Sequence, residues 1–154
     1  MFEFTEILPF AAQVKKLYVS SCRTVCQKYE LTQTEFEILD FLGEKTGLDT
    51  ANEISRQRLI KKANVSTSVE RLIKKGYLRR IPDSNDRRLI HLELTGKADR
   101  PVSEIRKTQR EFFSRFFLGL SAEEIATYKM LTKKLLSTLR IYGDTLKRSR
   151  LTYE

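Results

Sequence analysis

Residues 58–95 have the sequence RLIKKANVSTSVERLIKKGYLRRIPDSNDRRLIHLELT. The first half predicts an amphipathic helix that ends at Gly76, because glycine readily adopts the left-handed conformation that closes helices. The apolar side of this helix consists of Val65, Val69, Leu72 and Ile73. The second half predicts two short strands, 77–81 and 89–94, joined by a turn-rich segment. The stretch therefore predicts a helix followed directly by a β-hairpin.

Capping boxes mark the starts of three further helices. In each box a hydroxyl residue precedes a glutamate by three positions, and the two side chains satisfy backbone N–H groups at the helix start. The pairs are Thr32 with Glu35, Thr50 with Glu53, and Ser121 with Glu124. The capping boxes and the apolar spacing together predict several helices. These cover about 7–29, the residues after Thr32, about 51–57, the residues from Pro101 through the aromatic run FFSRFF, and Ser121 to about Tyr142.

A short helix, a turn, an amphipathic helix and a β-hairpin, in this order, make up a winged helix-turn-helix. We therefore expect a mainly α (α+β) fold with a two-strand wing. The chain has 154 residues and shows no internal repeat, low-complexity block or linker, so we expect one domain over 1–154. The winged helix-turn-helix region should occupy about 31–97.

The net charge of +9 is distributed unevenly along the chain. Residues 1–55 carry five Lys/Arg and nine Asp/Glu, whereas residues 56–100 carry thirteen Lys/Arg and five Asp/Glu. A local basic field of this kind indicates a polyanionic partner, with nucleic acid ahead of an anionic membrane. A basic, solvated face without a partner is the alternative.

The side of the central helix opposite its apolar stripe is polar and cationic. At about 100° per residue, this face carries Ala63, Asn64, Thr67, Arg71 and Lys74, with Lys61, Lys62, Ser66 and Ser68 at the start or on the flanks. Arginine can bind guanine, asparagine can bind adenine, and serine or threonine can reach a base or a phosphate. The residue types therefore favour a DNA-reading helix over a merely solvated one.

The expected hairpin turn carries two arginines, Arg87 and Arg88. A hairpin beside a major-groove helix reaches the flanking minor groove, whose negative potential favours arginine. Asp83 and Asp86 would repel phosphate if they pointed toward it, so we expect them to bond turn amides or to hold an arginine in place. The alternative is a polar turn that contacts nothing else.

The chain resembles the MarR family of transcriptional regulators over its whole length, most strongly over 50–98. The family's wing signature, D-x-R followed by a hydrophobic alternation and L-T, is matched by Asp86, Arg88, Ile90, Leu92, Leu94 and Thr95. Its helix ending, R-L-x-x-K-G-[YL], is matched by Arg71, Leu72, Lys75, Gly76 and Tyr77. The chain departs from the pattern at Lys61, where many relatives have a capping Ser or Asp.

The resemblance implies a homodimer on a pseudo-palindromic double-stranded DNA operator, with dimerisation helices at about 5–30 and 99–145. It also implies DNA contacts from residues 61–71 and from Arg87 and Arg88. Many relatives release DNA on binding a small aromatic or phenolic ligand, which suggests a repressor with an effector of that class; the sequence assigns no effector residues.

Other kinds of site find little support. One histidine, His91, and two cysteines cannot complete a metal site, so we expect neither a metal nor a cofactor. No catalytic set or phosphate loop is evident, so we expect no enzyme. No apolar run approaches the ~20 residues of a membrane span. The N-terminus lacks the basic start of an export signal and cysteines are few, which favours a reduced cytoplasmic setting.

Two alternatives to a ligand-responsive DNA-binding repressor remain. One is a basic winged-helix module for protein or RNA contacts. The other is a thiol-based redox sensor that uses Cys22, which lies four residues before Cys26 on the first helix. Neighbouring cations could lower a thiol pKa, but buried, inert thiols are more common.

Overall fold

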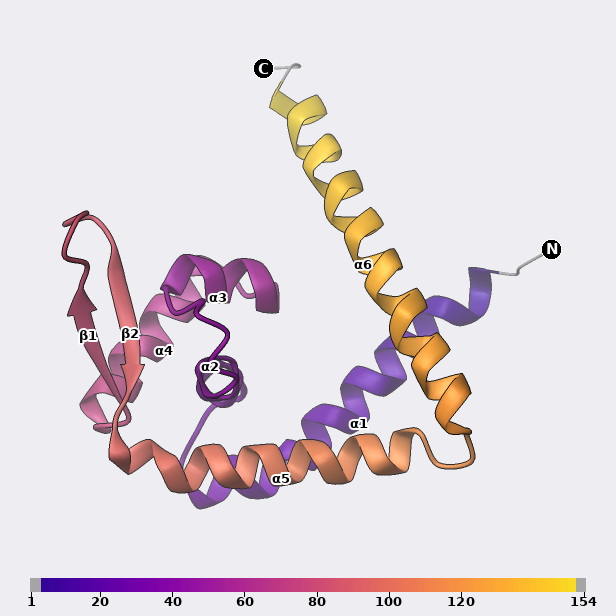
Figure 1. The fold of residues 1–154 in the computed structure, drawn as a ribbon, viewed down its shortest axis with the longest axis horizontal. Coiled ribbons are helices and arrows are strands. Elements are labelled where there is room, and N and C mark those ends of the chain that lie inside the picture. The colour runs from indigo at the N-terminus through magenta and orange to yellow at the C-terminus, as the bar shows by residue number, and fades with distance from the viewer. Residues whose placement is uncertain (1–3, 152–154) are drawn as a thin grey trace. The chain divides into compact units, whose positions relative to one another are not determined.

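The computed structural model describes residues 4–151 and the side chains of residues 5–146 (Figure 1). It divides into two compact units, Met1–Phe113 and Ser114–Glu154. The elements in chain order are η1 (Phe4–Glu6), α1 (Ile7–Lys28), α2 (Gln33–Gly43), α3 (Ala51–Arg58), α4 (Lys62–Lys74), β1 (Leu78–Pro82), β2 (Ile90–Leu94), η2 (Gly96–Ala98), α5 (Asp99–Phe116) and α6 (Ala122–Leu151). The expected mainly helical winged fold is confirmed, and both strands lie within one residue of their predicted ranges.

The first unit is built around α2, which Figure 1 shows end-on between the α3–α4 pair and α5. Phe36, Ile38 and Leu39 of α2 are completely buried. The other elements contribute the remaining large buried side chains, which include Ile54, Val65, Leu72, Leu78, Leu92 and Ile105. Burial of an aliphatic or aromatic side chain contributes roughly 1.5–3 kcal/mol, so this cluster holds α3, α4 and the wing in one body.

The predicted capping boxes are present at α2 and α3. The Thr32 hydroxyl accepts from the amide of Glu35, and the Glu35 carboxylate accepts from the amide of Thr32. Thr50 and Glu53 form the same reciprocal pair at α3. In the second unit, the reciprocal bonds between Ser121 and Glu124 begin α6. Local sequence thus determines these three helix starts, because each box is complete within four residues.

The start of α5 differs from the prediction. The helix begins at Asp99, two residues before Pro101, which lies buried in its first turn. Thr95 precedes η2 but makes no side-chain cap, because its hydroxyl donates instead to the carbonyl of Gly76 at 2.6 Å. This bond joins the end of the wing to the end of α4.

The last helix is longer and more exposed than predicted. It continues to Leu151, beyond the expected end near Tyr142. The residues expected to face inward are largely exposed in the single chain, including Tyr128, Leu131, Leu135 and Leu139. These apolar side chains form a stripe along α6 that is largely exposed in the part of the chain that the structure describes. Within the described residues, no helix is both long and apolar enough to cross a membrane.

Candidate nucleic-acid interface

The helix-turn-helix consists of α3 and α4 joined by a tight turn. Leu59 ends α3 in the left-handed conformation, with φ 54°, and the hydroxyl of Ser55 donates to the carbonyl of Ile60 at 2.7 Å. Arg58 fastens α3 to α2, because its guanidinium donates to the carboxylates of Asp40 at 2.7 Å and Glu44 at 2.5 Å. These contacts set the direction in which α4 leaves the turn.

The N-terminus of α4 is open and basic. Lys61 occupies the N-cap position and makes no side-chain cap, because an ammonium group has no acceptor. Lys61 and Lys62 are both exposed. The first N–H groups of a helix carry partial positive charge and bind anions readily. Lys61, which stands where many MarR-family relatives have Ser or Asp, therefore adds positive charge at the N-terminus of α4, and this charge favours the binding of a phosphate.

The exposed face of α4 presents most of the predicted DNA-binding side chains. Asn64, Ser66, Thr67 and Arg71 are all exposed, and opposite them Val65, Val69 and Leu72 are buried. The hydroxyl of Thr67 donates to the carbonyl of Ala63 at 3.0 Å, which leaves its oxygen able to accept a further bond. One α-helical surface thus carries amide, hydroxyl and guanidinium groups.

Ser68 does not belong to this face, so its placement among the DNA-contacting residues is wrong. Only 5% of Ser68 is exposed. Position 68 lies three residues after Val65 and four before Leu72, and residues at these spacings share one side of a helix. The polar side chain therefore sits on the inward stripe, where its small size fits beside the core.

The wing is an antiparallel pair in which Arg79 lies opposite Glu93 and Ile81 lies opposite His91. Two arginines of β1 form ion pairs: Arg79 Nε lies 2.8 Å from the Glu93 carboxylate, and Arg80 pairs with Glu70 of α4. Both pairs are largely exposed, and exposed pairs of this kind contribute only about 0–1 kcal/mol. The second one nevertheless connects the wing to the side of α4.

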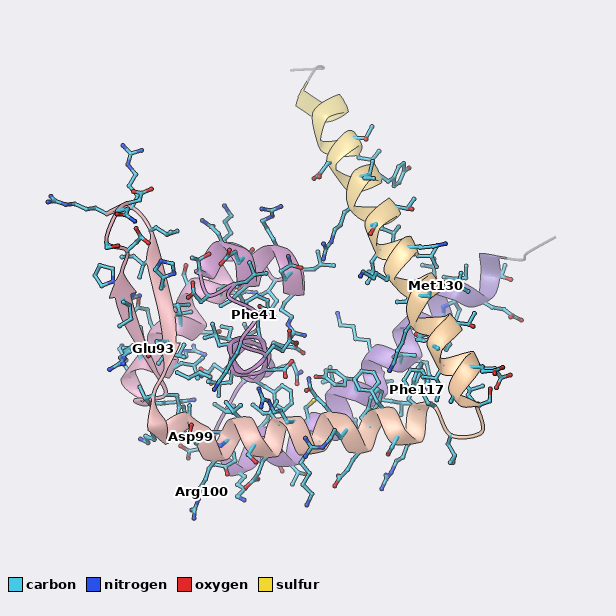
Figure 2. All side chains as sticks on the ribbon, viewed as in Figure 1. Phe41, Glu93, Asp99, Arg100, Phe117 and Met130 are labelled. Atoms are coloured by element: carbon cyan, nitrogen blue, oxygen red, sulfur yellow. The ribbon has the colours of Figure 1, made fainter. Side chains whose placement is uncertain are left out.

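The tip of the wing is organised by its acids and presents its arginines. One oxygen of Asp83 accepts from the amides of Asn85 and Asp86, both at 2.7 Å, and Asp86 accepts from the amide of Arg88 at 2.9 Å. Within the described part of the chain, no ion pair involves Arg87 or Arg88, and both are exposed. Figure 2 shows side chains with terminal nitrogen atoms extending from this tip. The acids therefore bond turn amides.

His91 has a structural role that the sequence did not suggest. Its Nδ1 lies 2.5 Å from Asp49 Oδ1 and its Nε2 lies 3.1 Å from Asp83 Oδ2. These hydrogen bonds raise the pKa of His91 above its usual value, with Asp49 the larger cause. Bonds from the Asp86 amide, His91 and the Asn85 amide lower the pKa of Asp83 to about 2. The alternation of β2 indicated only on which side of the strand His91 lies. No local sequence signal identified its partners Asp83 and Asp49, and Asp49 lies 42 residues away.

The two cysteines lie in an environment that disfavours thiolate. Cys22 is completely buried and Cys26 is partly buried. Burial raises the pKa of Cys22 to about 11 and also raises the pKa of Cys26. Because the thiolate is the reactive form, both thiols are poorly suited to oxidation at neutral pH.

An aromatic cluster lies where α1 meets α5 within the first unit. The ring of Tyr18 makes an edge contact with Phe112 at a centroid distance of 5.3 Å, and Phe112 makes another with Phe113 at 5.3 Å. The amide nitrogen of Gln109 donates to the Tyr18 hydroxyl at 3.0 Å. Desolvation raises the Tyr18 pKa, so this phenol stays neutral.

Within the described residues, no group of three or more His, Cys, Asp or Glu side chains could hold a metal ion.

Comparisons with known proteins agree with this architecture. Residues 29–89 match the family model described as "MarR family". The uncharacterized HTH-type transcriptional regulator YsmB of Bacillus subtilis is 26% identical over 113 residues, which cover 73% of this chain and 77% of that protein.

Two solved structures have the same fold. NadR in complex with 4-hydroxyphenylacetate aligns with a TM-score of 0.74 and 24% identity, over 88% of this chain and 95% of that one. BpsR of Bordetella bronchiseptica, whose DNA binding is regulated by 6-hydroxynicotinic acid, aligns with a TM-score of 0.68 and 21% identity, over 88% and 96%. With its helix-turn-helix, its wing and these matches, the chain has the winged helix-turn-helix fold, and its residues 29–89 are similar to the MarR family of transcriptional regulators.

Proposed function

We propose that the protein is a sequence-specific repressor that binds double-stranded DNA and is released by a small organic ligand. The observation that carries the proposal is the pairing of two exposed surfaces in one body. The face of α4 presents Asn64, Thr67 and Arg71, and the wing tip presents Arg87 and Arg88 without an acidic partner among the described side chains.

Each surface suits a different part of a duplex. Short polar side chains and an arginine on a helix can enter a major groove and bond base edges, while the basic N-terminus of α4 binds a phosphate. The wing arginines suit the narrow minor groove beside it. The basic excess of residues 56–100 supplies the field that attracts the backbone.

The active form is a homodimer on a pseudo-palindromic operator. The apolar stripe of α6 and the exposed apolar residues of α1, among them Ile7, Leu8 and Phe10, support this assignment. Exposed apolar residues of this kind often mark a surface that contacts another protein. Two copies would place two α4 helices on successive turns of the duplex, as paired half-sites require.

The effector is a small aromatic molecule of the phenolic or aromatic-acid class, and no metal takes part. Support comes from NadR and BpsR, which share the fold and whose ligands are 4-hydroxyphenylacetate and 6-hydroxynicotinic acid. The residues that would bind the effector are not assigned.

A gel shift with the duplex upstream of the protein's own gene tests the proposal. Specific binding should survive a large excess of random duplex, and single-stranded RNA of the same sequence should compete poorly. Equal competition by random DNA or by RNA would favour a general basic module instead.

The redox alternative has a direct test. The Cys22→Ser variant and the double variant Cys22→Ser with Cys26→Ser should both keep DNA binding and its release by ligand. Cys22 is buried, Cys26 is partly buried, and burial raises the pKa of both thiols. Loss of regulation in Cys22→Ser with DNA binding intact would favour a thiol sensor.

A further inference from the structure

One histidine links the wing to the body of the first unit through both of its ring nitrogens. Nδ1 of His91 faces Asp49, which lies in the loop between α2 and α3, at 2.5 Å. Nε2 faces Asp83, at the base of the wing turn, at 3.1 Å. Two carboxylates from different segments thus meet one imidazole.

This geometry requires the imidazolium. A neutral imidazole has one N–H donor and one lone pair, so it can donate to only one of two carboxylates. The lone pair would then face the other carboxylate oxygen, which is unfavourable. The protonated ring donates from both nitrogens and supplies the charge that both acids need.

Backbone hydrogen bonds also connect the segments that carry Asp49 and His91. The amide of Leu92 donates to the carbonyl of Asp49 at 2.8 Å, and Thr50 forms an isolated bridge with His91. The second oxygen of Asp83 holds the amides of Asn85 and Asp86 in the turn that leads to the wing arginines. The path from Asp49 through His91 to Asp83 therefore joins the start of α3 to the wing tip.

The other charged groups near His91 are already paired or favour its protonation. On α3, the Glu53 carboxylate accepts from the amides of Asp49 and Thr50, and its charge acts on His91. On the same side of the hairpin, Glu93 is paired with Arg79. The acids of the loop, of α3 and of the wing turn thus favour the charged ring.

We propose that His91 is a positioning residue for DNA binding: the protonated Asp49–His91–Asp83 bridge holds the wing arginines against the duplex, and deprotonation loosens the wing and lowers DNA affinity. This inference rests on the proposed function. It adds a pH dependence that belongs to the wing and not to α4.

The direction follows from the two titrating partners. The pKa of His91 is raised by its carboxylate partners, so the bridge is complete below the unfolded value of about 6.5 and is lost as the pH rises through the folded value. The pKa of Asp83 is lowered to about 2, so Asp83 stays ionised throughout. DNA affinity should therefore decline as the pH rises through the folded value, which lies above about 6.5.

The bridge can be tested without DNA. His91 is the only histidine of the chain, so its ring protons give one NMR titration curve in the full-length protein. The midpoint should lie above about 6.5 and should fall when Asp49→Asn and Asp83→Asn are combined. A midpoint at or below that value in the unmodified protein would overturn the bridge.

DNA affinity measured by fluorescence anisotropy from pH 6 to pH 9 tests the positioning role. The unmodified protein should lose about threefold or more in affinity across this range, as expected for a single linked protonation. His91→Gln should give a nearly flat profile and a lower affinity at pH 6. The N-terminal amine is present in both proteins, so it cannot account for the difference.

A variant that lacks the wing arginines tests whether His91 acts through the wing. In a protein carrying Arg87→Ala and Arg88→Ala, the pH dependence should disappear if His91 acts through the wing. Persistence of the full pH dependence would mean that His91 acts on DNA directly and would overturn the positioning role. Absence of DNA binding at every pH would overturn the proposed function and the DNA part of this inference, while the NMR titration tests the bridge separately.

Discussion

The carboxylate of Asp86 accepts a hydrogen bond from the backbone amide of Arg88 at 2.9 Å, two residues along the wing turn. The acid therefore bonds the turn backbone, and the guanidinium of Arg88 is not used to neutralise it. This relationship explains how acids and arginines can lie together at a surface that we propose to contact phosphate. Asp83 and Asp86 shape the turn, and Arg87 and Arg88 extend from it.

Replacing Arg87 or Arg88 with Ala should weaken DNA binding through the operator flanks. The loss should be greatest on A·T-rich flanks, because a narrow minor groove concentrates negative potential. Anisotropy with operators that differ only in their flanks measures this. Asp86→Ala is the control and should resemble a milder arginine variant that stays folded. Unchanged affinity in both arginine variants would show that the segment is only a polar turn.

Affinity for duplex DNA should fall steeply with salt. If each subunit neutralises several phosphates, the slope of log affinity against log salt for the dimer should be about −6 or steeper. Titration of the complex with KCl at constant pH gives this slope. A flat response would assign the thirteen Lys/Arg of residues 56–100 to something other than a nucleic-acid backbone.

Thr50→Ala should lower the free energy of unfolding by about 0.5–2 kcal/mol, because it removes a capping bond at the start of α3. Thr50 is 8% exposed, and its hydroxyl also donates to the Glu53 carboxylate at 2.8 Å. Urea unfolding followed by circular dichroism measures the change. Ser137→Ala, at an exposed interior position on the side of α6 away from the apolar stripe, is the control and should cost nothing. An equal change in the free energy of unfolding in both variants would contradict a stabilising role for the cap.

The protein should sediment at micromolar concentration as a dimer of the 18.0 kDa chain. Obligate dimers typically bury about 2,000 Å² or more, and Leu135 and Leu139 lie on the exposed stripe that would be covered. Leu135→Glu with Leu139→Glu should shift the protein toward monomer. Ser137→Glu, on the opposite side of α6, should leave the dimer intact. A stable, folded monomer of the unmodified chain would contradict the assignment.

Local patterns were sufficient to predict the three capped helix starts and the apolar side of α4. The capping boxes lie within four residues, and Val65, Val69 and Leu72 repeat at helical spacing. The same reasoning failed for Ser68, because residue chemistry was given more weight than position. A serine is small enough to occupy an inward site, and only the packing around it shows that it does.

Tertiary pairings were not accessible from the sequence. Asp49 and His91 are brought together by the folding of the α2–α3 loop onto β2. No periodicity relates residues this far apart. For Asp86 the sequence allowed either a turn amide or an arginine as partner, and the choice depends on the backbone path of the turn. The length of α6 was underestimated, because the helix continues to Leu151 through a charged segment that lacks an apolar pattern.

The central claim is that α4 reads base sequence, and base preference in the Arg71→Ala protein tests it most directly. Arg71 is exposed on the same face as Asn64. Anisotropy should be measured with an operator and with every single-base variant of its half-site. Arg100→Ala serves as the control, because Arg100 extends from α5 on the side away from α2 (Figure 2). Arg71→Ala should cost about 1–3 kcal/mol and relax the preference at particular positions. An Arg71→Ala protein with unchanged affinity and unchanged preference at every position would contradict the account.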